Sequence, residues 1–223
     1  MGIPLSMICA PCRLCGTNVE FEPTLTAGNV GFGVTCQECT AKHDAERLER
    51  ARKIKLASEW NNICPPLFKD TELAKLPCLE KSLAALAWRF YDGQGLNLWG
   101  IPNSGKTRTL FLIVNRLHFS GRRCKVFSPA DFMHELEARN YHRAEWVRKL
   151  ARIDVVGFDD MDKLALTRPQ EKIFFALLDK RMTTKRPCLF THNSTAAELE
   201  YNFKLGTAMV RRIRQFTKSI HFP

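Results

Sequence analysis

The sequence predicts an α/β protein in which helices flank a parallel sheet, preceded by a small cysteine-rich module. Short apolar segments alternate with helical patterns beyond residue 95, which is the order that parallel strands with crossover helices produce. A loop of the form GxxxxGKT joins the first of these segments to a helical pattern. Five of the nine cysteines lie in the first 39 residues, a segment too small to fold on a hydrophobic core alone.

Composition places the chain among globular proteins with a polyanionic partner. The 223 residues are 45% hydrophobic, and no apolar run approaches the roughly 18 residues of a membrane span. The N-terminal stretch does not read as a signal peptide, so we expect a soluble, cytoplasmic protein. A net charge of +11 favours nucleic acid as a partner because the basic residues are clustered. The clusters span residues 47–55, 122–125, 139–152 and 211–214.

Two cysteine pairs predict a structural zinc site. Cys12 with Cys15 and Cys36 with Cys39 form a CxxC…CxxC pattern with 20 residues between the pairs. Each pair lets two thiolates reach one ion from a tight turn, and four thiolates complete a tetrahedron around Zn²⁺. Disulfides are disfavoured because a nucleotide-binding loop implies a reducing compartment. We therefore expect a zinc-ribbon-like module. The alternative ligands for one of the four positions are Cys9 and His43.

The region around and after the second pair predicts a hairpin, a linker and a second domain. Glycine-rich residues 28–33 predict a β-hairpin between the two pairs. Residues 41–60 are charged with intermittent apolar positions, which predicts an exposed helix, and residues 82–91 predict a packed one. We therefore expect a zinc-binding module with its linker helix at residues 1–58 and a second domain at residues 59–223.

The stretch GIPNSGKT at residues 100–107 predicts a phosphate-binding loop. The apolar strand at residues 96–99 leads into it and a helical pattern follows, which is the context that such a loop requires. Backbone N–H groups and the helix N-terminus are expected to surround the phosphates. Lys106 would give a positive charge to the β- and γ-phosphates, and the Thr107 hydroxyl would be a ligand of Mg²⁺. The nucleotide-binding residues are therefore Gly100, Ile101, Pro102, Asn103, Ser104, Gly105, Lys106 and Thr107.

Asn103 occupies a position where several families of phosphate-binding loops carry glycine. Glycine permits a positive φ there, and asparagine is one of the few other residues that reach the left-handed region readily. The sequence therefore predicts left-handed backbone at Asn103, in a loop that still binds a nucleotide.

Two acidic residues follow the third predicted strand. The strands at residues 124–128 and 153–158 are separated by a helix that begins near residue 130. Asp159 and Asp160 come directly after the later strand, and its carboxyl end places them beside the phosphate loop. We expect Asp159 to hold Mg²⁺, and Asp160 to orient the attacking water or accept its proton. Two acids alone would suggest an acidic strand end or a helix cap, but the upstream loop favours the catalytic interpretation.

The last predicted strand and helix supply two further candidates. Asn193 follows the strand at residues 187–191 and would hydrogen-bond the γ-phosphate or the lytic water; alternatively it caps the helix at residues 195–201. The basic helix at residues 208–216 is either a solvated or nucleic-acid-facing surface or the source of an arginine for a neighbouring subunit's γ-phosphate.

The order of these motifs resembles one family, the DnaC/IstB-type helicase-loader ATPases of the AAA+ class. The resemblance implies the P-loop NTPase fold, and Arg212 is the position that best matches the family's arginine finger. The stretches that carry it are NICPPLF at 62–68, LNLWGIPNSGKT at 96–107, LARIDVVGFDD at 150–160, RPCLFTHN at 186–193 and LGTAMVRRIR at 205–214.

The resemblance implies an ATP-dependent DNA replication protein, in a host cytoplasm if phage-encoded. Such a protein binds ATP and Mg²⁺, self-associates through Arg212, grips single-stranded DNA and loads or remodels a replicative ring helicase. The resemblance also implies that residues 1–58 bind the protein partner and that residues 59–223 form the AAA+ ATPase domain. Lys106, Asp160, Asn193 and Arg212 would be the catalytic residues. The alternatives are an IstB-like transposition helper ATPase, a non-hydrolysing zinc- and DNA-binding adaptor, and a small-molecule kinase, which would require a basic lid that the sequence does not suggest.

Overall fold

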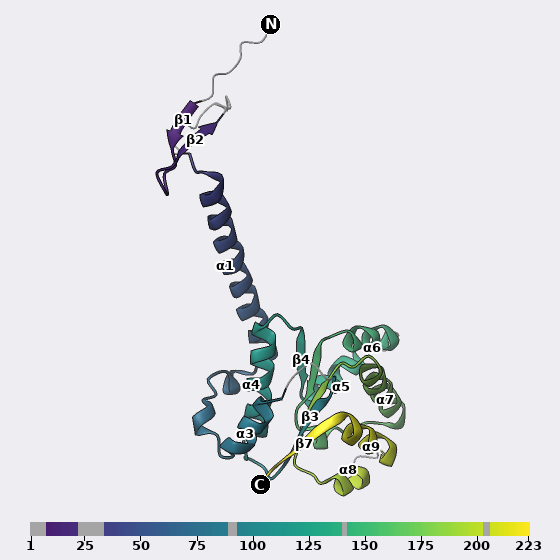
Figure 1. Ribbon diagram of the computed structural model, residues 1–223. Coiled ribbons are helices and arrows are strands. Elements are labelled where there is room, and N and C mark those ends of the chain that lie inside the picture. The colour runs from purple at the N-terminus through teal and green to yellow at the C-terminus, as the bar shows by residue number, and fades with distance from the viewer. Residues whose placement is uncertain (1–7, 22–33, 89–92, 140–141, 203–205) are drawn as a thin grey trace. The chain divides into compact units, whose positions relative to one another are not determined.

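The computed structural model describes residues 8–21, 34–88, 93–139, 142–202 and 206–223 (Figure 1). The chain divides into two compact units, Met1–Ala57 and Ser58–Pro223. No helix within the described ranges combines the length and the apolar character that crossing a membrane requires.

The first unit contains an antiparallel hairpin that flanks the first cysteine pair. Strand β1 (Ile8–Pro11) pairs with β2 (Asn18–Phe21). The turn between them is closed by hydrogen bonds from the Cys12 N–H to the Thr17 carbonyl and from the Gly16 N–H to the Cys12 carbonyl, both 2.8 Å. The strand before the cysteines therefore partners β2, whereas the predicted hairpin at residues 28–33 lies outside the described residues.

A long charged helix follows, as predicted. Helix α1 (Gln37–Ile63) is mostly exposed, and it extends a few residues beyond both predicted ends. Charged side chains one turn apart, such as Arg47 with Asp44 and Arg52 with Glu49, lie 3.9 and 3.7 Å from each other. Such exposed pairs each stabilise a helix by only a few tenths of a kcal/mol, about 0.3–0.5.

A five-stranded parallel sheet forms the centre of the second unit. Its strand order is β4-β5-β6-β3-β7, and every described neighbouring pair runs parallel. The predicted α/β fold with a parallel sheet is therefore confirmed. The bounds are β3 Gly95–Gly100, β4 Cys124–Phe127, β5 Val155–Phe158, β6 Cys188–His192 and β7 Thr217–Phe222.

Helices cover both faces of this sheet (Figure 1). Neighbouring residues of one strand serve opposite faces: Val156 packs in the cluster with α5, α6, α7 and α9, and Val155 in the cluster with α3 and α4. Burial on both faces explains the nearly continuous apolar runs of β5 and β6. The helices are α2 Pro66–Lys69, α3 Leu79–Leu86, α4 Lys106–Phe119, α5 Pro129–Glu137, α6 Arg143–Ala151, α7 Arg168–Thr183, α8 Ala196–Asn202 and α9 Gly206–Phe216, with short 3₁₀ turns η1 Leu73–Lys75 and η3 Met161–Lys163.

Strand β7 is absent from the sequence prediction. It is an edge strand that pairs with β3 alone among the described strands, and its residues alternate in burial. Ile220 and Phe222 are buried, whereas Lys218 and His221 are exposed. A short strand with polar residues at alternate positions lacks the apolar run that identified the interior strands.

Candidate functional site

The loop at residues 100–107 joins β3 to α4 at the carboxyl edge of the sheet. Asn103 has a φ of 60°, so the predicted left-handed backbone is confirmed. Gly100 has a φ of 138°, and a Cβ at this position would lie 1.9 Å from the Phe222 carbonyl oxygen, so only glycine fits. The loop leads into the N-terminus of α4, whose first N–H groups have no acceptor within the helix and attract anions.

Lys106 lies inside this loop. Its side chain is buried, and Nζ donates to the carbonyl oxygens of Gly100 at 3.0 Å and Ile101 at 2.5 Å, and to Ser104 Oγ at 3.3 Å. Burial lowers the pKa of the ammonium group, and the carboxylate of Asp160 opposes that effect most strongly. A buried cation held by neutral carbonyl oxygens favours an anion with several oxygen acceptors, which a nucleotide phosphate supplies.

The two predicted Mg²⁺ ligands lie in contact. The Thr107 hydroxyl donates to Asp159 Oδ1 at 2.8 Å, and the Thr191 hydroxyl donates to the same oxygen at 2.5 Å. Burial raises the pKa of the Asp159 carboxyl, and the two hydroxyls lower it. Because Mg²⁺ prefers oxygen ligands and one carboxylate with a hydroxyl is a common donor set, these residues fit that ion. Thr191 was not predicted as a site residue. The available indication was its hydroxyl group near the carboxyl end of β6, the edge of the sheet that holds the phosphate loop.

Asp160 begins a left-handed turn at the end of β5. Its φ is 50°, its N–H donates to Thr191 Oγ1 at 2.8 Å, and its Oδ2 lies 2.5 Å from Lys163 Nζ. Thr191 therefore accepts from one of the two acidic residues and donates to the other, which fixes both relative to β6. The Asp160 side chain lines the same pocket as Lys106 and Asn193.

The backbone of Asn193 is held by Asp162, an acidic residue that was not predicted from the sequence. The Asn193 N–H donates to Asp162 Oδ2 at 3.1 Å, while Asp162 Oδ1 is buried and has no hydrogen-bond partner among the described residues. The capping alternative for Asn193 is wrong, because Thr195 caps α8. The Thr195 hydroxyl accepts from the Glu198 N–H at 3.3 Å, and the Glu198 carboxylate accepts from the Thr195 N–H.

A pocket of about 740 Å³ unites these residues. One wall is the phosphate loop with Asp160 and Asn193, and the other is formed by residues 67–77. On that second wall Phe68 stacks on Phe111 at 5.1 Å between ring centroids, and the Arg108 guanidinium lies 5.6 Å from the centroid of the Phe68 ring. A polar, cationic wall facing a partly apolar one suits a ligand with a phosphate end and a base end.

The profile of the IstB-like ATP binding protein family matches residues 40–221 of the chain. The chain belongs to this family. No curated protein sequence matches it. The IstB-like protein is similar in structure to DnaI, at 19% identity and a TM-score of 0.56 over 74% of this chain and 94% of that one. It is also similar to the DnaC helicase loader, at 16% identity and a TM-score of 0.56 over 74% of this chain and 99% of that one.

A larger protein shares the same fold. The replication initiator DnaA, bound to AMPPCP and single-stranded DNA, matches with 16% identity and a TM-score of 0.58 over 71% of this chain. The IstB-like protein covers 50% of that initiator's length. At identities this low, the structural likeness establishes the fold alone, which is the P-loop AAA+ type. Together with the family match, it confirms the resemblance to DnaC/IstB-type ATPases that the sequence motifs indicated.

Arg212 of the IstB-like protein does not line its own nucleotide pocket. Its guanidinium forms an ion pair with Asp179 of α7 and lies 4.9 Å from the centroid of the Phe175 ring. The side chain is partly exposed, at 34%. A role in hydrolysis would therefore require that it reach the pocket of another subunit.

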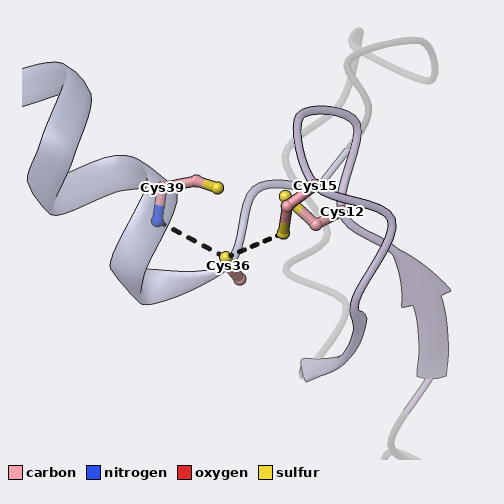
Figure 2. Close-up of side chains that lie close together, drawn as sticks. All are labelled: Cys12, Cys15, Cys36 and Cys39. Carbon is pink, nitrogen blue, oxygen red and sulfur yellow. Dashed lines mark hydrogen bonds between the residues drawn. The ribbon is translucent and has the colours of Figure 1, made fainter.

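The four predicted zinc ligands gather at one point (Figure 2). The Sγ atoms of Cys12, Cys15, Cys36 and Cys39 all lie within 4.8 Å of one another. N–H groups point at the sulfurs, including Cys39 N–H to Cys36 Sγ at 3.4 Å and Leu14 N–H to Cys12 Sγ at 3.5 Å. The backbone N–H groups of Cys36, Leu14 and Cys15, in that order of effect, lower the pKa of Cys12 to about 6. Four convergent sulfurs with N–H donors fit a structural Zn²⁺ ion.

The alternative zinc ligands lie outside this group. Cys9 is exposed on β1 and His43 is exposed on α1, and the group of potential ligands within the described residues comprises the four paired cysteines. The spacing of the two pairs therefore predicted the whole set.

A buried histidine gives the second unit of the IstB-like protein a predictable pH dependence. His192 Nε2 lies 2.8 Å from Asn97 Oδ1 and Nδ1 lies 2.7 Å from the Ser194 carbonyl oxygen, and burial lowers its pKa. The unfolded chain therefore binds this proton more tightly, so stability falls as pH drops below about 6.5, by at most ~1.4 kcal/mol per pH unit. Urea unfolding between about pH 7.5 and 5.5 should show this loss, and His192→Gln should reduce it. An equal loss in His192→Gln, or the same reduction in the exposed control His134→Gln, would contradict the assignment.

Proposed function

We propose that this IstB-like protein is an ATPase that binds single-stranded DNA and loads or remodels a replicative ring helicase. The observation that carries the proposal is the pocket in which Lys106, the Thr107–Asp159 pair, Asp160 and Asn193 converge. Family membership supports ATP binding, and the likeness to DnaI and DnaC supports the helicase-related role. The net charge of +11 supports the DNA partner.

Each residue has a defined role in the proposed hydrolysis. Lys106 neutralises negative charge on the phosphates, and Thr107 with Asp159 would hold Mg²⁺, which supplies further charge neutralisation. Asp160 orients the attacking water or accepts its proton, and Asn193 hydrogen-bonds the γ-phosphate or that water. The Lys163 ammonium group, 2.5 Å from Asp160 Oδ2, holds this carboxylate in the pocket that both residues line.

Asp160→Asn is expected to reduce ATP turnover by about 100-fold or more while nucleotide binding persists, because asparagine cannot accept the proton of the attacking water. Single-turnover hydrolysis and binding of a fluorescent ATP analogue would be measured on the same preparation. The exposed Glu137→Gln on α5 removes a carboxylate away from the pocket and should leave both quantities unchanged. Full turnover in Asp160→Asn would favour a non-hydrolytic or differently arranged site.

We propose that Arg212 acts on the nucleotide of a neighbouring subunit. Arg212→Ala should lower turnover by about 1000-fold. Mixing Arg212→Ala with Lys106→Ala subunits should restore part of the activity, since some interfaces then combine an intact pocket with an intact arginine. A mixture of Lys106→Ala with Asp160→Asn supplies the control, because both lesions affect the pocket and every site stays defective. Absence of restoration in the first mixture would argue against action between subunits.

A transposition helper is the second candidate, and the family match favours it as much as the structural likeness favours a loader.

In both cases we propose that residues 1–58 bind the protein partner, in the cytoplasm. The full chain, tagged and recovered from its own host with ATP present, should retain a ring helicase. A Cys36→Ser variant should lose that partner while it still binds ATP. Recovery of a transposase in its place would favour the second candidate.

A further inference from the structure

The amino ends of three neighbouring strands carry a concentration of basic residues. Strands β4, β5 and β6 are adjacent and parallel, so their amino ends lie at one edge of the sheet, opposite the edge that holds the nucleotide pocket. Strand β5, with four residues, separates the two edges by roughly 13 Å. The basic residues that precede these strands, here named the amino-end rim, are Arg122, Arg123, Arg152, Lys185 and Arg186.

One carboxylate ties part of the rim together. Asp154 Oδ1 lies 2.7 Å from Arg186 Nη1, and Asp154 Oδ2 lies 3.6 Å from Arg123 Nε. The Arg123 side chain also donates to the Arg152 carbonyl oxygen at 2.7 Å, which joins the loop before β4 to the loop before β5. The five basic residues of the rim and Asp154 together carry a formal charge of +4 (five positive, one negative).

A buried arginine holds the loops beneath the rim in place. Arg181 has no exposed surface, and its guanidinium donates to the carbonyl oxygens of Leu150, Ile153, Asp154 and Pro187 at 2.7 to 3.2 Å. These carbonyls belong to the last turn of α6 and to the loops before β5 and β6. The loops that present the rim are therefore fixed before any partner arrives, and the buried guanidinium adds to the positive potential above it.

The composition of the rim favours nucleic acid over an acidic protein. Four of the five residues are arginines, whose planar guanidinium groups match phosphate oxygens. Among the large exposed hydrophobic side chains of the described residues, Phe119 at the end of α4 is the nearest to the rim in sequence, whereas a protein interface normally buries a larger apolar centre.

We propose that the amino-end rim binds the phosphate backbone of the single-stranded DNA. The inference rests on the proposed function, and it places the DNA at the edge of the sheet away from the nucleotide pocket. The rim and the pocket thus act as separate sites on one rigid sheet, so loss of rim charge should weaken DNA binding and leave nucleotide binding intact.

A triple variant tests this surface without disturbing Asp154. Its substitutions are Arg122→Gln, Arg152→Gln and Lys185→Asn, the last chosen because Lys185 has a φ of 52°, which asparagine tolerates. The matched control removes the same charge from exposed positions on α3 and the first turns of α7. Its substitutions are Lys81→Gln, Arg168→Gln and Lys172→Gln.

Binding of a labelled single-stranded thymidine oligonucleotide would be measured by fluorescence anisotropy at several salt concentrations. The rim variant should bind on the order of ten-fold more weakly, and its log–log salt slope should fall by about 2, since three phosphate contacts are lost. The control should stay within about two-fold of the unaltered protein. ATP-analogue affinity and thermal melting should be the same in all three proteins.

Each other outcome overturns the inference in a distinguishable way. Equal losses in the rim and control variants overturn the rim and leave the proposed function standing. An unaltered protein that binds ATP but no oligonucleotide overturns both the rim and the DNA part of the proposed function. Rim-dependent binding of poly-glutamate without rim-dependent binding of the oligonucleotide would replace nucleic acid with an acidic protein partner.

Discussion

Replacement of Lys106 by alanine is expected to lower ATP affinity by about 100-fold or more and to abolish measurable turnover. The ammonium group is buried within the loop that would surround the phosphates, whereas the other basic residues that line the pocket, Lys75, Arg108 and Lys163, lie outside that loop. Its removal therefore takes away the positive charge that lies within the phosphate loop. Isothermal titration with an ATP analogue and Mg²⁺ would measure the loss.

A second lysine variant distinguishes the loss of the buried ammonium group from the loss of one positive charge elsewhere on the protein. Lys81→Ala removes an exposed ammonium group from α3 and should leave affinity and turnover unchanged. Thermal melting of Lys106→Ala should remain cooperative, because burial of the charged ammonium group, which lowers its pKa, is itself unfavourable. Nucleotide affinity close to that of the unaltered protein in Lys106→Ala would mean that the pocket is not the ATP site.

Removal of zinc is expected to unfold the first unit while the second unit stays folded. A structural zinc site contributes about 10–16 kcal/mol of apparent binding free energy, and Cys12 is the one buried hydrophobic residue in the described part of the first unit. Elemental analysis should find one Zn²⁺ per chain. After treatment with a strong chelator, NMR signals of residues 8–21 should collapse to unfolded positions, and those of the sheet should not move.

The cysteines provide their own control for this experiment. Cys36→Ser removes a ligand whose sulfur lies 3.6 Å from that of Cys15, and should lose the ion. Cys9→Ser alters an exposed thiol outside the group and should retain it. Zinc loss in both variants, or a chelated protein with unchanged NMR signals, would contradict a four-cysteine structural site.

The features that could be predicted from sequence are those encoded locally. The phosphate loop, the conformation of Asn103 and the four gathered cysteines each follow from short spacings. The interior strands were visible because burial on both faces makes them apolar throughout.

The features that escaped prediction depend on residues far apart in the chain. Thr191 joins Asp159 and Asp160 across 32 and 31 positions, and Asp162 reaches the Asn193 N–H across 31. The residues next to Thr191 and Asp162 in the sequence do not indicate that these side chains will contact Asp159, Asp160 or Asn193. The ion pair of Arg212 with Asp179 is of the same kind, since the sequence identified the arginine but not what it touches in its own subunit.

The placement of β3 has a consequence for how the chain is made. This strand, which leads into the phosphate loop, is flanked by β6 and β7, both of which come later in the sequence. Its Asn97 meets Ser219, 122 positions further on. Pairings of such separation form slowly, and domains fold during synthesis only as their partners leave the ribosome. In a nascent chain, the strand that carries the phosphate loop therefore lacks one of its two neighbours until β7 has emerged.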